Sequence, residues 1–282
     1  MSAPAYAPYD VPGYIGALRR EGELLAAAAE RAGMGAAVPS CPDWAVRDLL
    51  KHTGYVHRWA AGFITRGLTR PAGAASEAEI LSQGLGDAEL PGWFREGHAA
   101  LVRALDEAAP DLDCWAFLAA PSPLAFWARR QAHETAIHRA DAGQAAAGTA
   151  DGAAGPPGGS AGPSSGPASG PAFEPAFAAN GVDELIMGFL ARSVRRGNWP
   201  GLPGSLAIHA ADGADGAADW LVRGGSEAPG VSHGTGPAGC DVTGPARDLY
   251  LTLWNRRPLD GLQVHGDPSI LAAFARALRI TW

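Results

Sequence analysis

One segment of this chain, residues 127–141, constrains the fold and the chemistry more than any other. It contains neither Gly nor Pro, so it is predicted to form one uninterrupted helix. Within it Glu134 and His138 are four residues apart, which places their side chains one above the other on the same helical face. A carboxylate and an imidazole in this arrangement can bind the same divalent metal ion. His133 lies about 140° around the helix from His138, so it is expected to face elsewhere.

A metal site that keeps one position open for water or substrate usually has three protein ligands. The best third candidate is His52, on a second predicted helix that Asp43 is expected to cap and that runs to about Arg66. His52 falls on the apolar stripe of this helix and is expected to point inward. His57, five residues further along, is expected to face away. The apolar stripe consists of Trp44, Leu49, Val56 and Trp59.

Three more charged residues bear on this candidate site. Asp48 and Asp141 each lie about one turn from one of the two inward histidines, so each carboxylate can orient a ring nitrogen. The alternatives are an exposed helix carboxylate for Asp48 and a helix-end residue for Asp141. Arg130 lies one turn before Glu134 and offers an account without metal, in which an ion pair neutralises a buried carboxylate. The pattern alone leaves both accounts open.

The N-terminal half is predicted to be a four-helix bundle, with the candidate metal site in its core. A polar connection separates the second and third helices and is expected to carry a short helical turn near residues 77–82. The four predicted helices are residues 10–31, with Asp10 as cap, 43–66, 91–109 and 122–142.

The remainder is predicted to be a linker and a smaller mixed unit, so the fold class is α+β with two domains. Gly, Ala, Pro and Ser dominate residues 144–172, a composition typical of a flexible linker. The predicted domains are therefore residues 1–143 and 173–282. The expected helices of the second domain are 181–196, capped by Asn180, 245–255 and 268–278. The expected strands are 205–210, 218–223, 240–243, 262–265 and the closing tail 279–282.

Composition excludes some classes of protein. The formal net charge of −7 gives no general attraction to nucleic acid. No stretch approaches the ~20 apolar residues of a membrane span, and no signal peptide is evident, so we expect a cytoplasmic protein. The three scattered cysteines argue against a disulfide framework. Cys41 is interpreted either as a small buried apolar residue or as a thiolate favoured at a helix start.

Two segments carry a family resemblance. Residues 41–52 (CPDWAVRDLLKH) and 129–141 (RRQAHETAIHRAD) resemble the signature segments of the mycothiol-dependent maleylpyruvate isomerase family, whose members are DinB-like four-helix metalloproteins. Residues 248–260 and 264–267 are similar to the end of its second, sterol-carrier-like α+β domain. The resemblance spans nearly the whole chain outside residues 67–90 and 143–172.

The resemblance implies a site and a chemistry. It implies His52, Glu134 and His138 as ligands of zinc or another divalent metal, with water completing the shell, and mycothiol as thiol cosubstrate. A thiolate held there adds to the double bond of maleylpyruvate, the bond rotates, and elimination gives the trans isomer. The resemblance also implies that an arginine of the second domain holds the diacid substrate; Arg256 is the best positional match, and Arg257 is its neighbour. The alternative interpretation of the two arginines is ordinary charge at a helix end.

Several functions therefore stay open. The preferred one is an isomerase or thiol S-transferase that acts on a small, including dicarboxylic, substrate. The alternatives are metal-assisted hydrolysis and a non-catalytic module that binds metal or a small ligand. Nucleic acid and membranes are not expected partners, and a monomer or weak homo-oligomer is expected.

Overall fold

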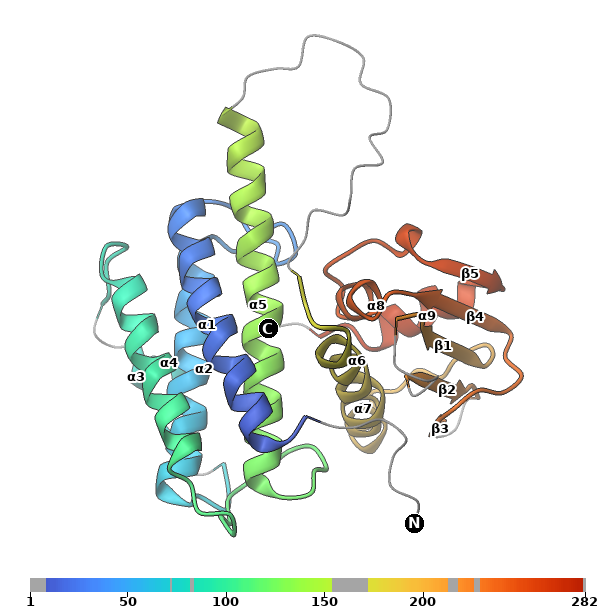
Figure 1. The fold of residues 1–282 in the computed structure, drawn as a ribbon, viewed down its shortest axis with the longest axis horizontal. Coiled ribbons are helices and arrows are strands. Elements are labelled where there is room, and N and C mark those ends of the chain that lie inside the picture. The colour runs from blue at the N-terminus through green and yellow to red at the C-terminus, as the bar shows by residue number, and fades with distance from the viewer. Residues whose placement is uncertain are drawn as a thin grey trace. The chain divides into compact units, whose positions relative to one another are not determined.

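The computed structural model describes residues 9–71, 73–81, 84–153, 172–212, 218–225 and 229–280. Contacts between Cα atoms divide the chain into two compact units (Figure 1). The helical unit contains residues 10–116 and 120–153. The α+β unit contains Tyr9, Phe117–Ala119 and residues 172–280. The fold class is thus the predicted two-domain α+β architecture, and each unit is described by itself below.

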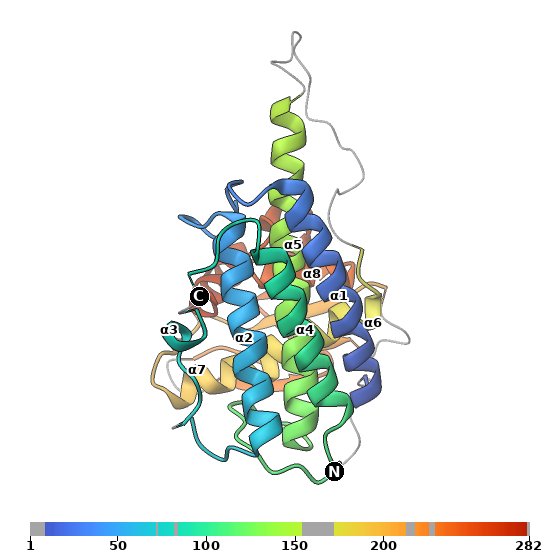
Figure 2. The ribbon, with the colours of Figure 1, turned by 90° about the vertical axis from the view of Figure 1, so that its left-hand side faces the viewer.

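The helical unit is a bundle of four long helices, as predicted. α1 lies against α5 and α4, and α2 lies against the same two helices, so α1 and α2 are diagonal to each other (Figures 1 and 2). The expected short turn in the polar connection is present as α3, where the Ser76 hydroxyl caps the Glu79 backbone N–H. The helices are α1 Val11–Ala32, α2 Val46–Arg66, α3 Glu77–Ile80, α4 Leu90–Asp106 and α5 Pro123–Ala153.

The first helix begins as predicted, but the second does not. Asp10 caps α1 by accepting the Gly13 N–H at 2.8 Å. Asp43 has a φ of +72° inside a turn, so it does not cap α2, and the prediction was wrong. Instead Ala45 precedes the helix, and its backbone N–H donates to the Asp48 carboxylate at 3.0 Å. Asp48 therefore satisfies a helix-start donor, and the structure does not support its predicted role beside His52.

The helix that carries Glu134 and His138 is longer than predicted. α5 continues to Ala153, so residues 144–153 are helical and the prediction that a flexible linker begins at residue 144 was wrong. The physical reason is the alanine-rich run in residues 145–147, because Ala has the highest helix propensity. The rest of the predicted linker, residues 154–171, lies outside the described residues.

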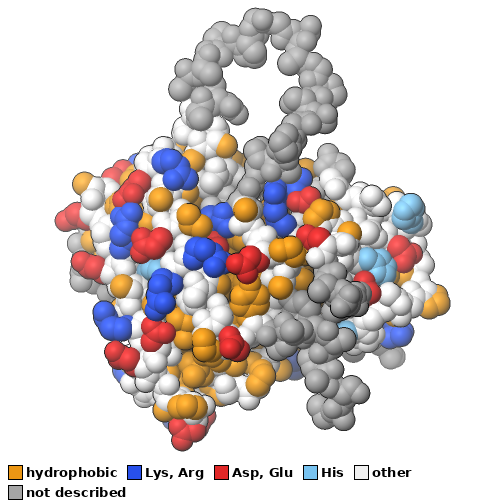
Figure 3. All heavy atoms as spheres, viewed as in Figure 1, with side chains coloured by type: hydrophobic (Ala, Val, Ile, Leu, Met, Phe, Trp, Pro, Cys, Tyr) orange, Lys and Arg blue, Asp and Glu red, His pale blue; other side chains and the backbone are white. Residues whose placement is uncertain are grey.

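Two contacts fix the face that α5 presents to α1. The His133 ring packs edge-to-face on Tyr14, with 6.3 Å between ring centroids. One turn and a half further along, Arg139 Nε donates to the Glu21 carboxylate at 2.7 Å. The adjacent face of α5 is thereby turned toward α2. Figure 3 shows acidic and basic side chains interspersed on the visible face of this unit.

The α+β unit contains a five-stranded sheet in the order β3-β2-β1-β4-β5. β1 and β4 are parallel and the other neighbours are antiparallel, with Leu206 opposite Val222 and Cys240. The four internal strands predicted from sequence are present, with ends shifted by at most one residue. The strands are β1 Leu206–Ala210, β2 Asp219–Arg223, β3 Gly230–His233, β4 Cys240–Gly244 and β5 Gln263–Gly266.

Three predictions for this unit need correction. β3 lies between residues 223 and 240, where no strand was predicted. The helix expected from residue 181 begins at Pro175 after Glu174, so Asn180 lies inside it and is not a cap. Arg279 and Ile280 form no strand, and residues 281–282 lie outside the described residues. The helices are α6 Pro175–Asp183, the π-helical η1 Glu184–Leu190, α7 Ala191–Arg195, α8 Ala246–Leu253, the short η3 Leu259–Gly261 and α9 Pro268–Ala277.

Asp183 joins these helices to the sheet. Its carboxylate accepts hydrogen bonds from Trp220 Nε1 on β2 at 3.1 Å and from the His233 ring on β3. Among the residues that the structure describes, we find no helix long and apolar enough to span a bilayer.

Candidate metal centre

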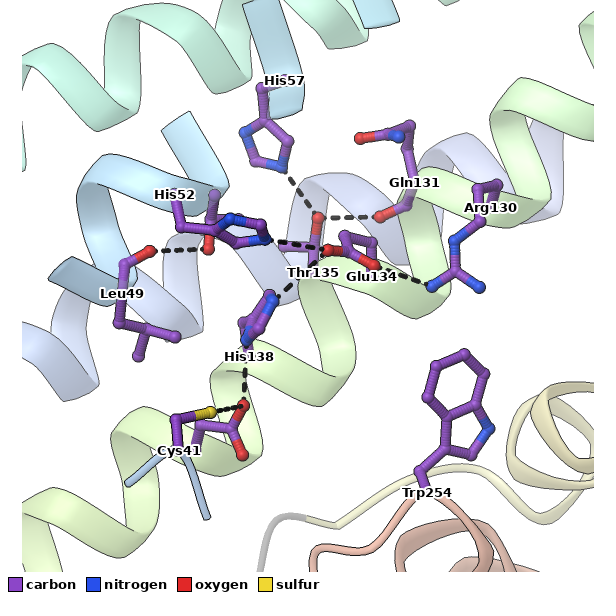
Figure 4. Close-up of polar contacts among 12 residues, drawn as sticks. Cys41, Leu49, His52, His57, Arg130, Gln131, Glu134, Thr135, His138 and Trp254 are labelled. Carbon is purple, nitrogen blue, oxygen red and sulfur yellow. Dashed lines mark hydrogen bonds and ion pairs between the residues drawn. The ribbon is translucent and has the colours of Figure 1, made fainter. Parts of the chain in front are cut away.

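The structure brings His52, Glu134 and His138 together in the helical unit (Figure 4). One ligand atom from each lies within 4.8 Å of the other two. Glu134 Oε1 is 3.4 Å from His52 Nε2 and 3.3 Å from His138 Nε2, so both histidines direct the same ring nitrogen at one oxygen. α5 supplies two of the three donors because residues four apart share a face. α2, packed beside it, supplies the third.

The two carboxylate oxygens of Glu134 have different partners. Oε1 faces the two histidines, and Oε2 accepts from Arg130 Nη2 at 3.0 Å. Burial alone would raise the pKa of this carboxyl group, but hydrogen bonds from His138 and His52 and the charge of Arg130 outweigh it and hold the pKa well below its usual value. The group is therefore a carboxylate at neutral pH.

His138 is oriented by Asp141. Its Nδ1 lies 2.9 Å from Asp141 Oδ2, and both side chains are fully buried. Burial lowers the pKa of His138, but the hydrogen bond to Asp141 and the Glu134 carboxylate outweigh it, so the pKa is raised. The contact to Asp141 holds a proton on Nδ1, so Nε2 is the nitrogen left to bind a metal ion, as outer carboxylates arrange for metal-binding histidines. The sequence suggested Asp48 and Asp141 as carboxylates that orient a histidine ring, and the geometry supports this role for Asp141.

Two residues that sequence reasoning did not connect with the site hold Asp141 in place. The Ser40 hydroxyl donates to Asp141 Oδ1, and Cys41 Sγ is 3.8 Å from Asp141 Oδ2. Both belong to the turn before α2, about 100 residues earlier in the chain, and only the family resemblance of residues 41–52 pointed to that turn. Cys41 is buried and lies five residues before the helix, so the structure favours its interpretation as a small buried residue.

His52 is the most accessible of the three. Its side chain is 16% exposed, against 3% for Glu134 and 0% for His138. The Trp44 ring packs on it, with 5.1 Å between ring centroids. A small molecule can therefore approach the cluster from the side of His52.

The other two histidines near the site are both buried. His133 faces Tyr14 of α1 and is not part of the cluster. His57 was predicted to face away, but it is fully buried, and that prediction was wrong. Its Nε2 lies 2.9 Å from Thr135 Oγ1, and the Thr135 hydroxyl donates to the Gln131 carbonyl at 2.7 Å. Thr135 must then accept from His57, which fixes the neutral Nε2–H tautomer.

This burial predicts a pH dependence of stability. Desolvation lowers the pKa of His57 well below 6.5, whereas an unfolded chain has a value of about 6.5. As the pH falls below 6.5, the unfolded chain takes up a proton first, so stability is full above this pH and is lost below it. The free energy of unfolding therefore changes with pH between 6.5 and 5. His57→Gln is expected to reduce the slope of this change by up to about 1.4 kcal/mol per pH unit.

Urea unfolding of the full chain at several pH values, followed by circular dichroism, measures this slope. His265→Gln, at an exposed position on β5, is the control. The same slope in the wild type and in His57→Gln would contradict the assignment. His98 on α4, whose pKa burial also lowers, is expected to leave a residual slope in the variant.

The arginines suggested for substrate binding lie in the α+β unit, just after α8. Arg256 is buried, and its Nη1 donates to the Trp254 carbonyl at 2.7 Å. Arg257 forms an ion pair with the Asp248 carboxylate.

Fold and site together define a two-domain α+β protein with a buried His/Glu cluster inside a helical bundle. Two family models match the chain: the mycothiol maleylpyruvate isomerase N-terminal domain over residues 15–143, and the C-terminal domain of the same family over residues 176–273. The chain belongs to the mycothiol maleylpyruvate isomerase family. No curated protein matches it significantly.

Two solved structures have a similar fold. Both are described as the mycothiol-dependent maleylpyruvate isomerase, one of them in a histidine-to-alanine mutant form. The mutant form is 12% identical with a TM-score of 0.56, and the other is 13% identical with a TM-score of 0.55. Each comparison covers 91% of this chain and 93% of the other. At this identity the likeness establishes the fold.

Proposed function

We propose that this protein is a mycothiol-dependent enzyme whose metal is held by His52, Glu134 and His138. The convergence of these three donors within 4.8 Å of one another carries the proposal. Zinc is the preferred ion, because two imidazoles and one carboxylate form a common catalytic zinc site with an open position. Iron, nickel and manganese suit the same nitrogen and oxygen donors.

The chain's own residues suit a cation and a small thiol. Glu134 is ionised, Asp141 directs His138 Nε2 into the cluster, and the partial exposure of His52 leaves a route of approach. A divalent metal bound there supplies the positive charge that keeps a coordinated thiol deprotonated near neutral pH. The family membership favours mycothiol as that thiol and a small acid as the second substrate.

The proposed reaction is isomerisation or the related thiol transfer. In isomerisation, the mycothiol sulfur adds to the activated double bond of a maleylpyruvate-like acid, the resulting single bond rotates, and elimination of the thiolate restores the double bond as trans. No atom is gained or lost. In transfer, the same sulfur forms a bond to an electrophilic carbon, and the group displaced from that carbon leaves with the electron pair of the broken bond. We propose a cytoplasmic enzyme, monomeric or weakly oligomeric, that acts on small molecules.

The test combines elemental analysis with turnover. Purified protein is expected to contain one equivalent of zinc or another divalent metal and to isomerise maleylpyruvate only when mycothiol is added. Turnover of an ester or amide without any thiol would favour metal-assisted hydrolysis. Metal binding with neither turnover nor mycothiol binding would favour the non-catalytic module.

Arg256 is proposed to hold the substrate carboxylate. Arg256→Met is expected to lower kcat/KM about 10- to 100-fold, the effect of losing one or two hydrogen bonds to a charged group, mostly through KM. Arg257→Met is the matched control, because it removes the guanidinium of the neighbouring residue, which lies beside Asp248. Steady-state kinetics with varied concentrations of the acid substrate, at saturating mycothiol, distinguishes the two variants. An unchanged KM in Arg256→Met would exclude this role.

A further inference from the structure

The ion pair between Arg130 and Glu134 has a geometry that bears on metal coordination. Both side chains are 3% exposed and belong to adjacent turns of α5. Arg130 takes Oε2 of the carboxylate, and the histidines face Oε1 (Figure 4). We propose that Arg130 is a positioning residue that restricts Glu134 to one-oxygen metal coordination and thereby keeps a coordination position open for the thiol.

The way in which Glu134 binds a metal ion decides whether a coordination position stays open. Carboxylates bind metals through one oxygen or through two. Two-oxygen binding by Glu134 would fill a position that a catalytic site keeps for water or substrate. Nothing in the donor set itself prevents this, because the two oxygens of a carboxylate are chemically equivalent. Two-oxygen binding is prevented if Oε2 has another partner, and Arg130 is that partner.

Arg130 is held firmly beside Glu134. Its guanidinium presents N–H donors in a rigid planar fork that suits a carboxylate, and Nη2 donates to Oε2 at 3.0 Å. It is also fixed from within the same helix, since residues four apart are neighbours on its surface. Glu134 can therefore bind a metal ion and form the ion pair with Arg130 at the same time, because each interaction uses a different oxygen.

A purely structural role for Arg130 makes a different prediction, and α5 provides the comparison. Arg139 donates to the buried Glu21 on α1 at 2.7 Å, so it forms a second buried arginine–carboxylate pair. Its carboxylate is not part of the cluster. Loss of either pair is expected to weaken the fold, whereas only loss of the Arg130 pair is expected to change metal coordination.

The experiment uses the full-length protein loaded with Co²⁺, whose visible spectrum reports coordination, and azide as a small ligand for the open position. The variants are Arg130→Met, the conservative Arg130→Lys, and Arg139→Met as matched control. Wild type is expected to bind azide with a spectral change. Arg130→Met is expected to bind Co²⁺ at least as tightly, because a nearby positive charge is gone. Its azide affinity is expected to fall about 10- to 100-fold, the range seen for outer partners of metal ligands.

Arg130→Lys, which keeps a charged donor, is expected to restore azide binding, and Arg139→Met to bind azide like wild type. Unchanged azide affinity in Arg130→Met would overturn the proposal, as would equal losses in Arg130→Met and Arg139→Met. A crystal structure of the zinc-loaded wild type tests the point without any variant: coordination by both Glu134 oxygens would also overturn it. The inference rests on the metal-binding part of the proposed function. Because azide replaces mycothiol, absence of mycothiol turnover with intact azide binding would count against the proposed reaction alone.

Discussion

His52→Ala is expected to remove bound metal and thiol-dependent turnover together. The substitution leaves only Glu134 and His138, both on α5, and two protein ligands hold a catalytic metal poorly. Metal affinity is expected to fall by more than about 100-fold, the upper end of the effect of removing an outer partner. Elemental analysis after dialysis and turnover with mycothiol measure the two losses.

The control for this variant comes from the same helix. His57→Gln changes a buried histidine of α2 that contacts Thr135 and does not belong to the cluster. It is expected to keep its metal and its activity at neutral pH. Full zinc occupancy in His52→Ala would remove the basis of the proposed function.

Asp141→Asn is expected to have the second largest effect. Asp141 holds the proton of His138 on Nδ1, and an asparagine amide in its place can donate to Nδ1 and favour the tautomer whose Nε2 carries the proton. That nitrogen then cannot bind a metal. Metal affinity is expected to fall about 10- to 100-fold, as measured by competition with a chromogenic chelator.

Asp48→Asn is the matched comparison, because sequence suggested the two aspartates equally. Asp48 accepts the Ala45 N–H at the start of α2; asparagine keeps an acceptor there but removes the negative charge at the helix N-terminus, so the free energy of unfolding is expected to fall by about 0.3–1 kcal/mol. Its metal affinity is expected to equal that of wild type. An equal loss of affinity in both aspartate variants would mean that Asp141 acts through stability alone.

The parts of the site that sequence predicted are those set by the geometry of a single helix. The spacing of Glu134 and His138 fixes their common face wherever the helix lies in the fold. His52 is 82 residues from Glu134, and its apolar stripe indicated only that it points inward. The resemblance of residues 41–52 to a family segment then connected the two helices.

The sequence-based predictions failed where contacts between distant parts of the chain determine the local structure. α2 contacts both α4 and α5, so it has two buried faces, and His57 lies on the one that a single apolar stripe does not reveal. The roles of Asp43 and Asp48 depend on the turn before α2, which packs against Asp141 of a distant helix. β3 has a glycine and polar residues in place of alternating apolar ones, and pairing with β2 makes it a strand.

The distribution of the three donors over two helices has a consequence for assembly. Glu134 and His138 are adjacent as soon as α5 forms, whereas His52 joins them only when α2 has docked. A cation held by all three acts as a reversible cross-link that closes an 82-residue loop, and it favours the docked state because the undocked chain binds it less tightly. With the metal binding proposed above, the supply of metal in the cell would set how much of this protein persists in folded form, in addition to how much of it is active.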